Sequence, residues 1–155
     1  MKTIYQNIIF ILFSLWSYNV NAQKDIQPPS APVLTLVSVQ PETGYTDLVW
    51  TLSASQDVIG YVLYSYNNGE GYAFFDTIWD ASIINYTNTG SASNYYSESY
   101  VIAAIDSSDN ISPLSNVLNT IFSRSDIDTC RKEIEINWNN YSDFPNHVSG
   151  YKIMA

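Results

Sequence analysis

The side chains that could perform acid–base chemistry are few and far apart in the sequence. His147 is the one histidine among 155 residues. A serine nucleophile needs a base held against it, so any such site would depend on this imidazole. His147 lies in a polar stretch near the end of the sequence, where we expect an exposed loop. Asp76 and Asp80 are the nearest candidate pair for hydrolysis by two carboxylates, but acids at a strand end commonly keep a sheet edge soluble. We therefore predict no catalytic residues.

Metal binding would require a cluster of ligand atoms, and one loop offers a partial set. Asp106, Asp109 and Asn110 supply three oxygen ligands within five positions. They lack the terminal bidentate acid that completes a calcium-binding loop. Asp and Asn side chains also close turns by accepting hydrogen bonds from nearby N–H groups. We expect turn formation here, no metal site and no cofactor.

The N-terminal segment has the composition of a secretory signal peptide. Lys2 supplies the positive charge of the n-region, and residues 8–16 form an almost entirely apolar h-region. Val20-Asn21-Ala22 then provides the small-residue cleavage site before Gln23. The alternative is a signal anchor retained in the membrane. A membrane span needs about 20 apolar residues, whereas polar residues close this run on both sides. We predict cleavage after residue 22, a secreted or cell-surface location, and no membrane insertion afterwards.

The charge of the remaining chain limits its partners. Removing Lys2 with the signal leaves five basic residues against fifteen acidic ones. The negative electrostatic field of this excess of acidic residues repels nucleic-acid phosphates and anionic lipid, so we predict no nucleic-acid partner. Cys130 is the one cysteine. In an exported chain it suggests either a disulfide partner outside this sequence or a free thiol.

From residue 28 onwards the apolar residues alternate with a period near two. Gly, Asn, Asp or Ser interrupts this alternation about every ten residues, which is typical of an all-β sandwich or barrel. Seven short strands fit one antiparallel, immunoglobulin-like β-sandwich. The predicted strands are residues 33–39, 46–52, 58–66, 72–78, 82–86, 99–105 and 116–122.

The pattern then begins again. The alternation around Trp50 recurs at Ile134, Ile136 and Trp138, and the two tryptophans lie 88 residues apart. Residues 148–153 likewise repeat the sequence at the start of the third predicted strand. We expect a truncated second copy of the domain, which could not bury its inner face alone. The predicted organisation is signal peptide 1–22, first domain 27–123, linker 124–129 and incomplete second domain 130–155.

Several motifs in this order resemble the fibronectin type III family. They are a proline-rich entry at 28–32, Leu48-x-Trp50, Gly60-Tyr61-x-Leu63-Tyr64, the segment 100–112, and Ser115-Asn116 before the last strand. The resemblance implies a core built around Trp50 and Tyr61. It also implies that Tyr100 is a corner tyrosine whose hydroxyl bonds the backbone near the fifth strand. The family often has Gly at the position of Asp109, and its usual Leu is not obvious between Asp80 and Ser99.

Aromatic residues gather on the outward positions of the third and fourth strands. If Tyr61 and Leu63 face the core, the outward set is Val62, Tyr64, Tyr66, Tyr72, Phe74 and Phe75. Exposed rings on a sheet can stack on sugars or on protein. Tyrosine is also simply a good strand former. The predicted interaction surface is Tyr64, Tyr66, Tyr72 and Phe74.

These observations favour a non-catalytic extracellular β-sandwich module that acts as a structural spacer or protein-interaction domain of a larger secreted or surface protein. Its partners would be neighbouring modules of the same polypeptide, and other surface proteins or polysaccharide. Two alternatives stay open. One is an ancillary domain of an extracellular hydrolase whose catalytic part lies outside this chain, and the other is a carbohydrate-binding module. The fold serves all of these roles.

Overall fold

The computed structural model describes residues 24–141, 143–145 and 147–153, so the predicted signal peptide lies outside the described residues. Within those ranges the regular elements are β-strands. They are β1 (Leu34–Val39), β2 (Thr46–Trp50), β3 (Val58–Asn67), β4 (Gly71–Ile78), β5 (Asn85–Asn88), β6 (Ser99–Asp106), β7 (Leu118–Asn119), β8 (Ser123–Asp128) and β9 (Glu133–Trp138). None of the described segments is a helix able to span a membrane.

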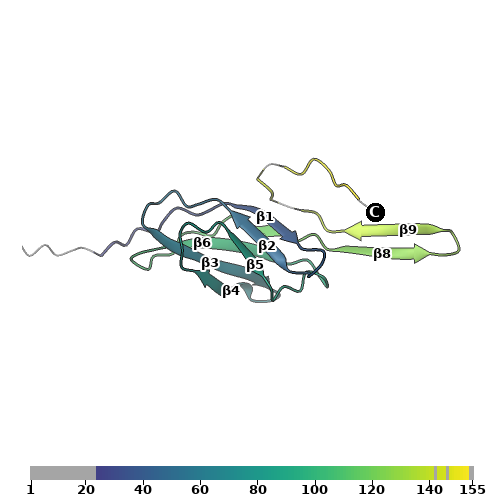
Figure 1. The fold of residues 1–155 in the computed structure, drawn as a ribbon, viewed down its shortest axis with the longest axis horizontal. Coiled ribbons are helices and arrows are strands. Elements are labelled where there is room, and N and C mark those ends of the chain that lie inside the picture. The colour runs from purple at the N-terminus through teal and green to yellow at the C-terminus, as the bar shows by residue number, and fades with distance from the viewer. Residues whose placement is uncertain (1–23, 142, 146, 154–155) are drawn as a thin grey trace, which may run out of the picture.

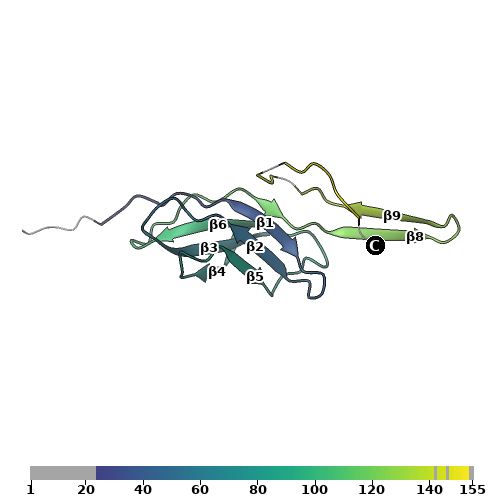
Figure 2. The ribbon, with the colours of Figure 1, turned by 45° about the horizontal axis from the view of Figure 1, so that its top comes forward.

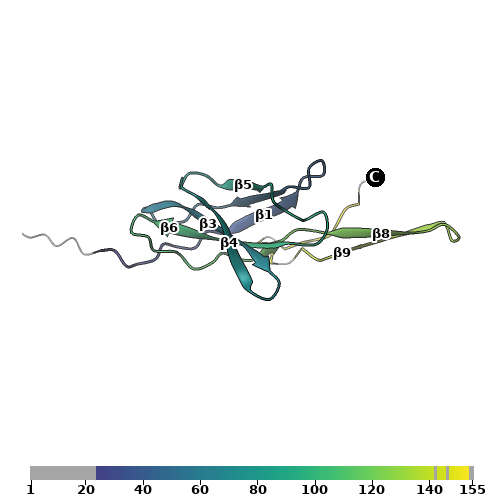
Figure 3. The ribbon, with the colours of Figure 1, turned by 90° about the horizontal axis from the view of Figure 1, so that it is seen from below.

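Two antiparallel sheets face one another to form the body of the molecule. One has the strand order β1-β2-β5, and the other has the order β4-β3-β6-β7. Figures 1 and 3 show the two layers, with the β8–β9 hairpin extending beyond them. The prediction of an all-β antiparallel sandwich is therefore confirmed. Figure 2 shows the chain after β9 turning back toward the sandwich.

The core lies between the two sheets because alternate residues of β2 and β3 point inward. Thr46, Leu48 and Trp50 are buried on β2. The Trp50 ring meets the Tyr61 ring edge to face, with centroids 5.4 Å apart. Tyr100 is fully buried on β6. Burying aromatic side chains of this size supplies a large share of the stability of a small sandwich.

Glycines allow β3 and β4 to approach and turn. Gly69 and Gly71, at the turn between β3 and β4, have φ values of +99° and +85°, which residues with side chains rarely adopt. Gly60 has a different role. A Cβ atom there would collide with the backbone carbonyl of Ile78, so the close approach of the two strands requires glycine.

The fifth strand differs from its predicted range of 82–86. It spans Asn85–Asn88, because the preceding residues are held in a turn. The Asp80 carboxylate accepts hydrogen bonds from both the amide and the hydroxyl of Ser82, at 2.8 and 2.6 Å. The Ile83 amide also donates to the Asp80 carbonyl. The chain can become extended only after this turn.

The second and seventh strands are shorter than predicted. β2 ends at Trp50 and not at residue 52, and Leu52 is 54% exposed. The Thr51 amide still bonds the Val33 carbonyl, but the Val33 amide donates to the Thr51 hydroxyl at 3.2 Å, so a side chain replaces the backbone acceptor where the pairing ends. β7 covers only Leu118–Asn119 of the predicted range 116–122. The Ile102 amide donates to the Ser115 hydroxyl, so a side chain replaces a backbone acceptor in this ladder.

Candidate interaction surfaces

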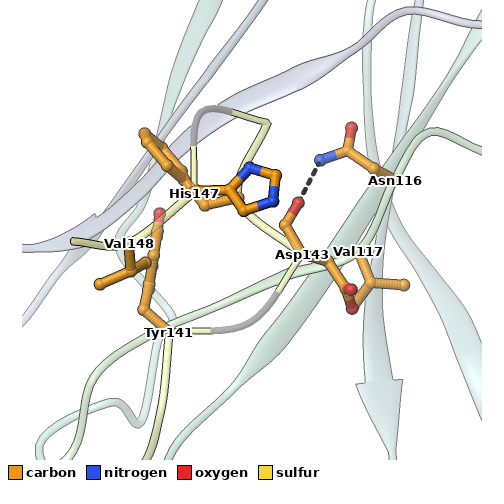
Figure 4. Close-up of a pocket in the computed structure, with 7 residues that line it drawn as sticks. Asn116, Val117, Tyr141, Asp143, His147 and Val148 are labelled. Carbon is orange, nitrogen blue, oxygen red and sulfur yellow. Dashed lines mark hydrogen bonds between the residues drawn. The ribbon is translucent and has the colours of Figure 1, made fainter.

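His147, the one histidine, lies on an open groove of about 570 Å³ between the C-terminal segment and the sandwich. Figure 4 shows it near Asp143 and Asn116, and the dashed line marks the Asn116 side-chain amide donating to the Asp143 carbonyl, 3.5 Å away. His147 is exposed, as expected from the sequence. Asp143, Tyr141 and Phe144 share the groove. The sequence alone did not relate this segment to Asn116.

The paired carboxylates are each occupied by local hydrogen bonds. Asp76 accepts a hydrogen bond of 2.6 Å from the Tyr86 hydroxyl and one of 2.7 Å from the Thr77 amide. Burial, followed by this hydrogen bond, raises the pKa of Tyr86 to about 12. Asp80 closes the turn before β5, and hydrogen bonds from Ser82 lower its pKa. Both acids thus have structural roles.

The loop that offers three oxygen ligands, Asp106, Asp109 and Asn110, is a turn built on Asp106. Its carboxylate accepts hydrogen bonds from the amides of Ser108 and Asn110 and from the Asn110 side chain, each at 2.8 Å. Burial opposes ionisation, but these donors outweigh it and lower the pKa of Asp106. Asp109 adopts a φ of +67°, the conformation that glycine usually supplies.

The structure places two further acids beside Asp106 that the sequence did not group with it. Ligand oxygens of Asp25, Asp57 and Asp106 all lie within 4.8 Å of one another. Asp109 and Asn110, the predicted companions of Asp106, do not belong to that trio. Sequence separation hid the cluster, because only the fold brings the entry segment and the loop before β3 to the end of β6.

The predicted aromatic surface lies on the outer face of the β3–β4 hairpin. Tyr64 pairs with Phe74 across the strands, and Tyr66 pairs with Tyr72. Both ring pairs meet edge to face, at 6.4 and 5.5 Å between centroids. Phe74 is 61% exposed and Tyr66 is 51% exposed, whereas Tyr64 and Tyr72 are half-buried. The four rings form one patch, and its role as an interaction surface stays a prediction.

Two residues predicted to face outward do not belong to that patch. Phe75 packs inward against Tyr86 and Tyr100, because it follows the outward-facing Phe74 along the strand and lies at the β-bulge opposite Leu63 and Tyr64. Val62 does lie opposite the core face, but it is only 5% exposed. β3 has a hydrogen-bonded strand on each side, and neighbouring side chains therefore shield it.

A polar cluster around Glu98, which the sequence did not reveal, holds the start of β6. The Glu98 carboxylate accepts hydrogen bonds from the hydroxyls of Ser91, Ser93 and Tyr100, at 2.6, 2.7 and 2.8 Å. The Ala92 amide donates to its second oxygen. Burial opposes ionisation of Glu98, but the four donors outweigh it and lower its pKa. A Ser-rich stretch preceding a Glu is a weak signal for such a cluster.

This cluster corrects the expected environment of the Tyr100 hydroxyl. The hydroxyl donates to Glu98 and accepts a hydrogen bond of 3.1 Å from the Asn88 side chain. It therefore bonds side chains, one of them on β5, and not the backbone as the family resemblance implied. The hydroxyl reaches the Glu98 carboxylate, and an ionised carboxylate is a stronger hydrogen-bond acceptor than a backbone carbonyl. Burial and this hydrogen bond raise the pKa of Tyr100 to about 12.

The β8–β9 hairpin presents a second surface, with one apolar and one acidic face. Residues 124–129, predicted to be a linker, largely form β8, because their backbone pairs with β9 along its whole length. Cross-strand pairing places Ile127 opposite Ile134 and Ser125 opposite Ile136. The apolar face, which Trp138 completes, is exposed. The opposite face carries Arg124, Asp126, Asp128, Glu133, Glu135 and Asn137.

No protein-family profile matches the chain, and no curated protein matches it. Among solved structures, an Fn3-like protein from Clostridium thermocellum is similar, with a TM-score of 0.49 and 22% identity, over 61% of this chain and 93% of that one. The pectate lyase Pel3 from Pectobacterium carotovorum has a TM-score of 0.46 and 13% identity, over 58% of this chain. A beta-1,2-glucanase from Parabacteroides distasonis has a TM-score of 0.48 and 20% identity, over 64% of this chain. This chain spans 26% and 13% of the length of those two enzymes.

Proposed function

We propose that the chain belongs to a non-catalytic, exported tandem β-sandwich protein, whose modules space or present neighbouring parts of a larger secreted or surface protein. One observation carries this proposal. The β8–β9 hairpin repeats the β1–β2 hairpin in register, and the contacts around its tryptophan repeat as well.

The register is the first part of that observation. Each core-facing pair of β1–β2 has a counterpart 88 or 89 residues later in β8–β9. Val39–Thr46 corresponds to Ile127–Ile134, Val37–Leu48 to Ser125–Ile136, and Leu34–Trp50 to Ser123–Trp138. The extra residue arises from the β-bulge between Leu34 and Leu36. Because a slip of one residue would turn these side chains to the other face, matching registers indicate the same inner face.

The surroundings of the two tryptophans are the second part. Trp50 meets Tyr61 at 5.4 Å and 62°, and Trp138 meets Tyr151 at 5.6 Å and 63°. The Tyr61 hydroxyl accepts a hydrogen bond from the Ser53 amide, at 3.2 Å. The Tyr151 hydroxyl accepts one from the Tyr141 amide, 88 residues after Ser53, at 2.9 Å.

A third equivalence concerns the strand ends. The Thr51 amide bonds the Val33 carbonyl, and the Asn139 amide bonds the Phe122 carbonyl. Together these repeated contacts support a second module that starts with β8, at residue 123, rather than at residue 130. The exposed apolar face of the hairpin is then the beginning of a second core, equivalent to the inner face of β1–β2.

The positions of the reactive side chains support a role without catalysis. Asp76 holds Tyr86, Asp80 closes the turn before β5, and Asp106 closes the turn after β6. Each acid therefore already stabilises the sandwich. In the proposed module the outer β3–β4 face, with Tyr66 and Phe74 exposed, is what the module presents to its neighbours.

Two tryptophan variants test the tandem arrangement. Trp50→Ala should cost about 3–5 kcal/mol of sandwich stability, the usual penalty for emptying a large aromatic site. Trp138→Ala should leave the sandwich transition within about 0.5 kcal/mol, because Trp138 belongs to another core. Urea denaturation of the mature chain, followed by far-UV circular dichroism, measures both. Equal losses in the two variants would contradict the proposal. Turnover of polysaccharide, ester or peptide substrates that disappears in His147→Ala would refute its non-catalytic part.

A further inference from the structure

The segment after β9 docks on the free edge of the first sandwich. Within the described residues β1 is paired on one side only, by β2. The Val37 amide donates to the Tyr141 hydroxyl at 2.9 Å, and the same hydroxyl donates to the Val37 carbonyl at 3.1 Å. One side chain thus satisfies both backbone groups of an edge residue, as a neighbouring strand would.

A second edge residue is satisfied in the same way from within the sandwich. Asn116 accepts a hydrogen bond from the Leu34 amide at 2.9 Å and donates to the Leu34 carbonyl at 3.0 Å. The Asn116 amide also reaches the Asp143 carbonyl of the docked segment. The edge of β1 is therefore closed by two side chains, one from each side of the proposed module boundary.

Apolar packing and further hydrogen bonds hold the docked segment. The rings of Tyr141 and Phe144 lie 5.5 Å apart and pack against the core of the sandwich. At the base of the segment, the Asn139 side chain accepts from the Phe122 amide at 2.6 Å and donates to the Thr120 carbonyl at 2.9 Å. This contact joins two modules by side chains as well as by the chain itself.

The repeat shows that the fold of a module does not require these aromatic rings. In the first module the position equivalent to Tyr141, 88 residues earlier, is Ser53, and none of the residues 51–57 between Trp50 and β3 is aromatic. Ser53 instead donates to the carbonyl of Ser30 in the entry segment, at 2.6 Å. The aromatic residues are therefore specific to the docking of the second module on the first.

We propose that Tyr141 and Phe144, in the segment after β9, form an inter-module clamp that holds two successive modules at a fixed angle and closes the β1 edge to strand addition. The partner of this surface is the preceding module of the same chain. The proposal rests on the tandem arrangement for its module boundary, but the edge contact itself is independent of it.

Amide hydrogen exchange tests the edge contact. Tyr141→Phe keeps the ring and removes the hydroxyl, so the Val37 amide should exchange about tenfold faster. The Leu34 amide, which Asn116 protects, should be unchanged in the same sample. Tyr95→Phe, at a tyrosine that is 76% exposed, is the matched control and should leave Val37 protected. Equal Val37 exchange rates in both variants would overturn the proposal.

A distance measurement tests the fixed angle. Cys130 is exposed at the tip of β8–β9 and accepts one spin label, and Asn68→Cys in the β3–β4 turn accepts the second. The distribution of distances between the two spin labels, measured by pulsed electron paramagnetic resonance, should be narrow. The double substitution Tyr141→Phe and Phe144→Ala should broaden it. A distance distribution whose width is the same with and without the two substitutions would overturn the clamp. The two proposals fail separately, because the tryptophan variants test the tandem arrangement through the sandwich transition, whereas Tyr141→Phe tests the edge contact through Val37 exchange.

Discussion

Replacing Glu98 by glutamine should destabilise the sandwich, because four donors converge on this carboxylate. Oε2 accepts from Ser91, Ser93 and Tyr100, and Oε1 accepts from the Ala92 amide. In Glu98→Gln the amide oxygen can replace Oε2, but the NH₂ group then faces the Ala92 N–H. One hydrogen bond is lost and three lose their ionic character.

The magnitude follows from the strength and exposure of these bonds. A hydrogen bond to a charged group contributes about 1.5–3 kcal/mol, roughly twice a neutral one. Glu98 is only half-buried, so water replaces part of what is lost. We expect Glu98→Gln to lower the free energy of unfolding by about 1–3 kcal/mol at pH 7. Glu42→Gln, in the exposed turn between β1 and β2, is the matched control.

The pH dependence gives a second measure of the same contact. The folded pKa of Glu98 is lowered, so the unfolded chain binds this proton more readily than the folded one. The stabilisation is present above the unfolded pKa of about 4.3 and is lost as the pH falls through the lower folded value. The difference between wild type and Glu98→Gln should therefore be constant from about pH 6 to 8 and shrink below about pH 4.

Urea denaturation at a series of pH values measures both quantities. Subtracting the Glu98→Gln curve from the wild-type curve removes the contributions of the other acids, as long as they do not couple to residue 98. The structural account would be refuted by a Glu98→Gln midpoint equal to that of Glu42→Gln at pH 7. A wild-type advantage that persists undiminished at pH 3 would refute the assigned ionisation.

Two further substitutions test the sandwich at single atoms. Tyr100→Phe should cost about 1–2 kcal/mol, because the lost hydroxyl leaves Glu98 and Asn88 without one partner each, and the fold should remain intact by circular dichroism; an unchanged denaturation midpoint would mean that the hydroxyl contact is dispensable. Gly60→Ala should cost about 1–3 kcal/mol, because the added methyl group forces β3 away from the Ile78 carbonyl. Ser65→Ala on the same strand is its control, and comparable losses in both variants would show that crowding at residue 60 is relieved without strain.

The sequence by itself determined the class of the fold and the centre of its core. A two-residue period interrupted by turn formers specifies strands, and the alternation around Trp50 assigns that residue to an inner face. The repetition of this pattern at Trp138 was also visible, because the inward positions of a strand must be apolar wherever it occurs. Strand ends were predicted poorly where a side chain competes with the backbone, as Asp80 does before β5 and Ser115 does at β7.

Only the tertiary structure decided which distant groups meet. The Glu98 cluster joins residues from the loop before β6 to Asn88 on β5, and Asp25 reaches Asp106 across 81 residues of sequence. The contact between Tyr141 and Val37 likewise spans 104 residues. Local pattern carries no information on such pairs, because a hydrogen bond depends on where the chain returns and not on the period of its side chains. The most specific features of this molecule, the Glu98 cluster and the closed edge of β1, are of that kind.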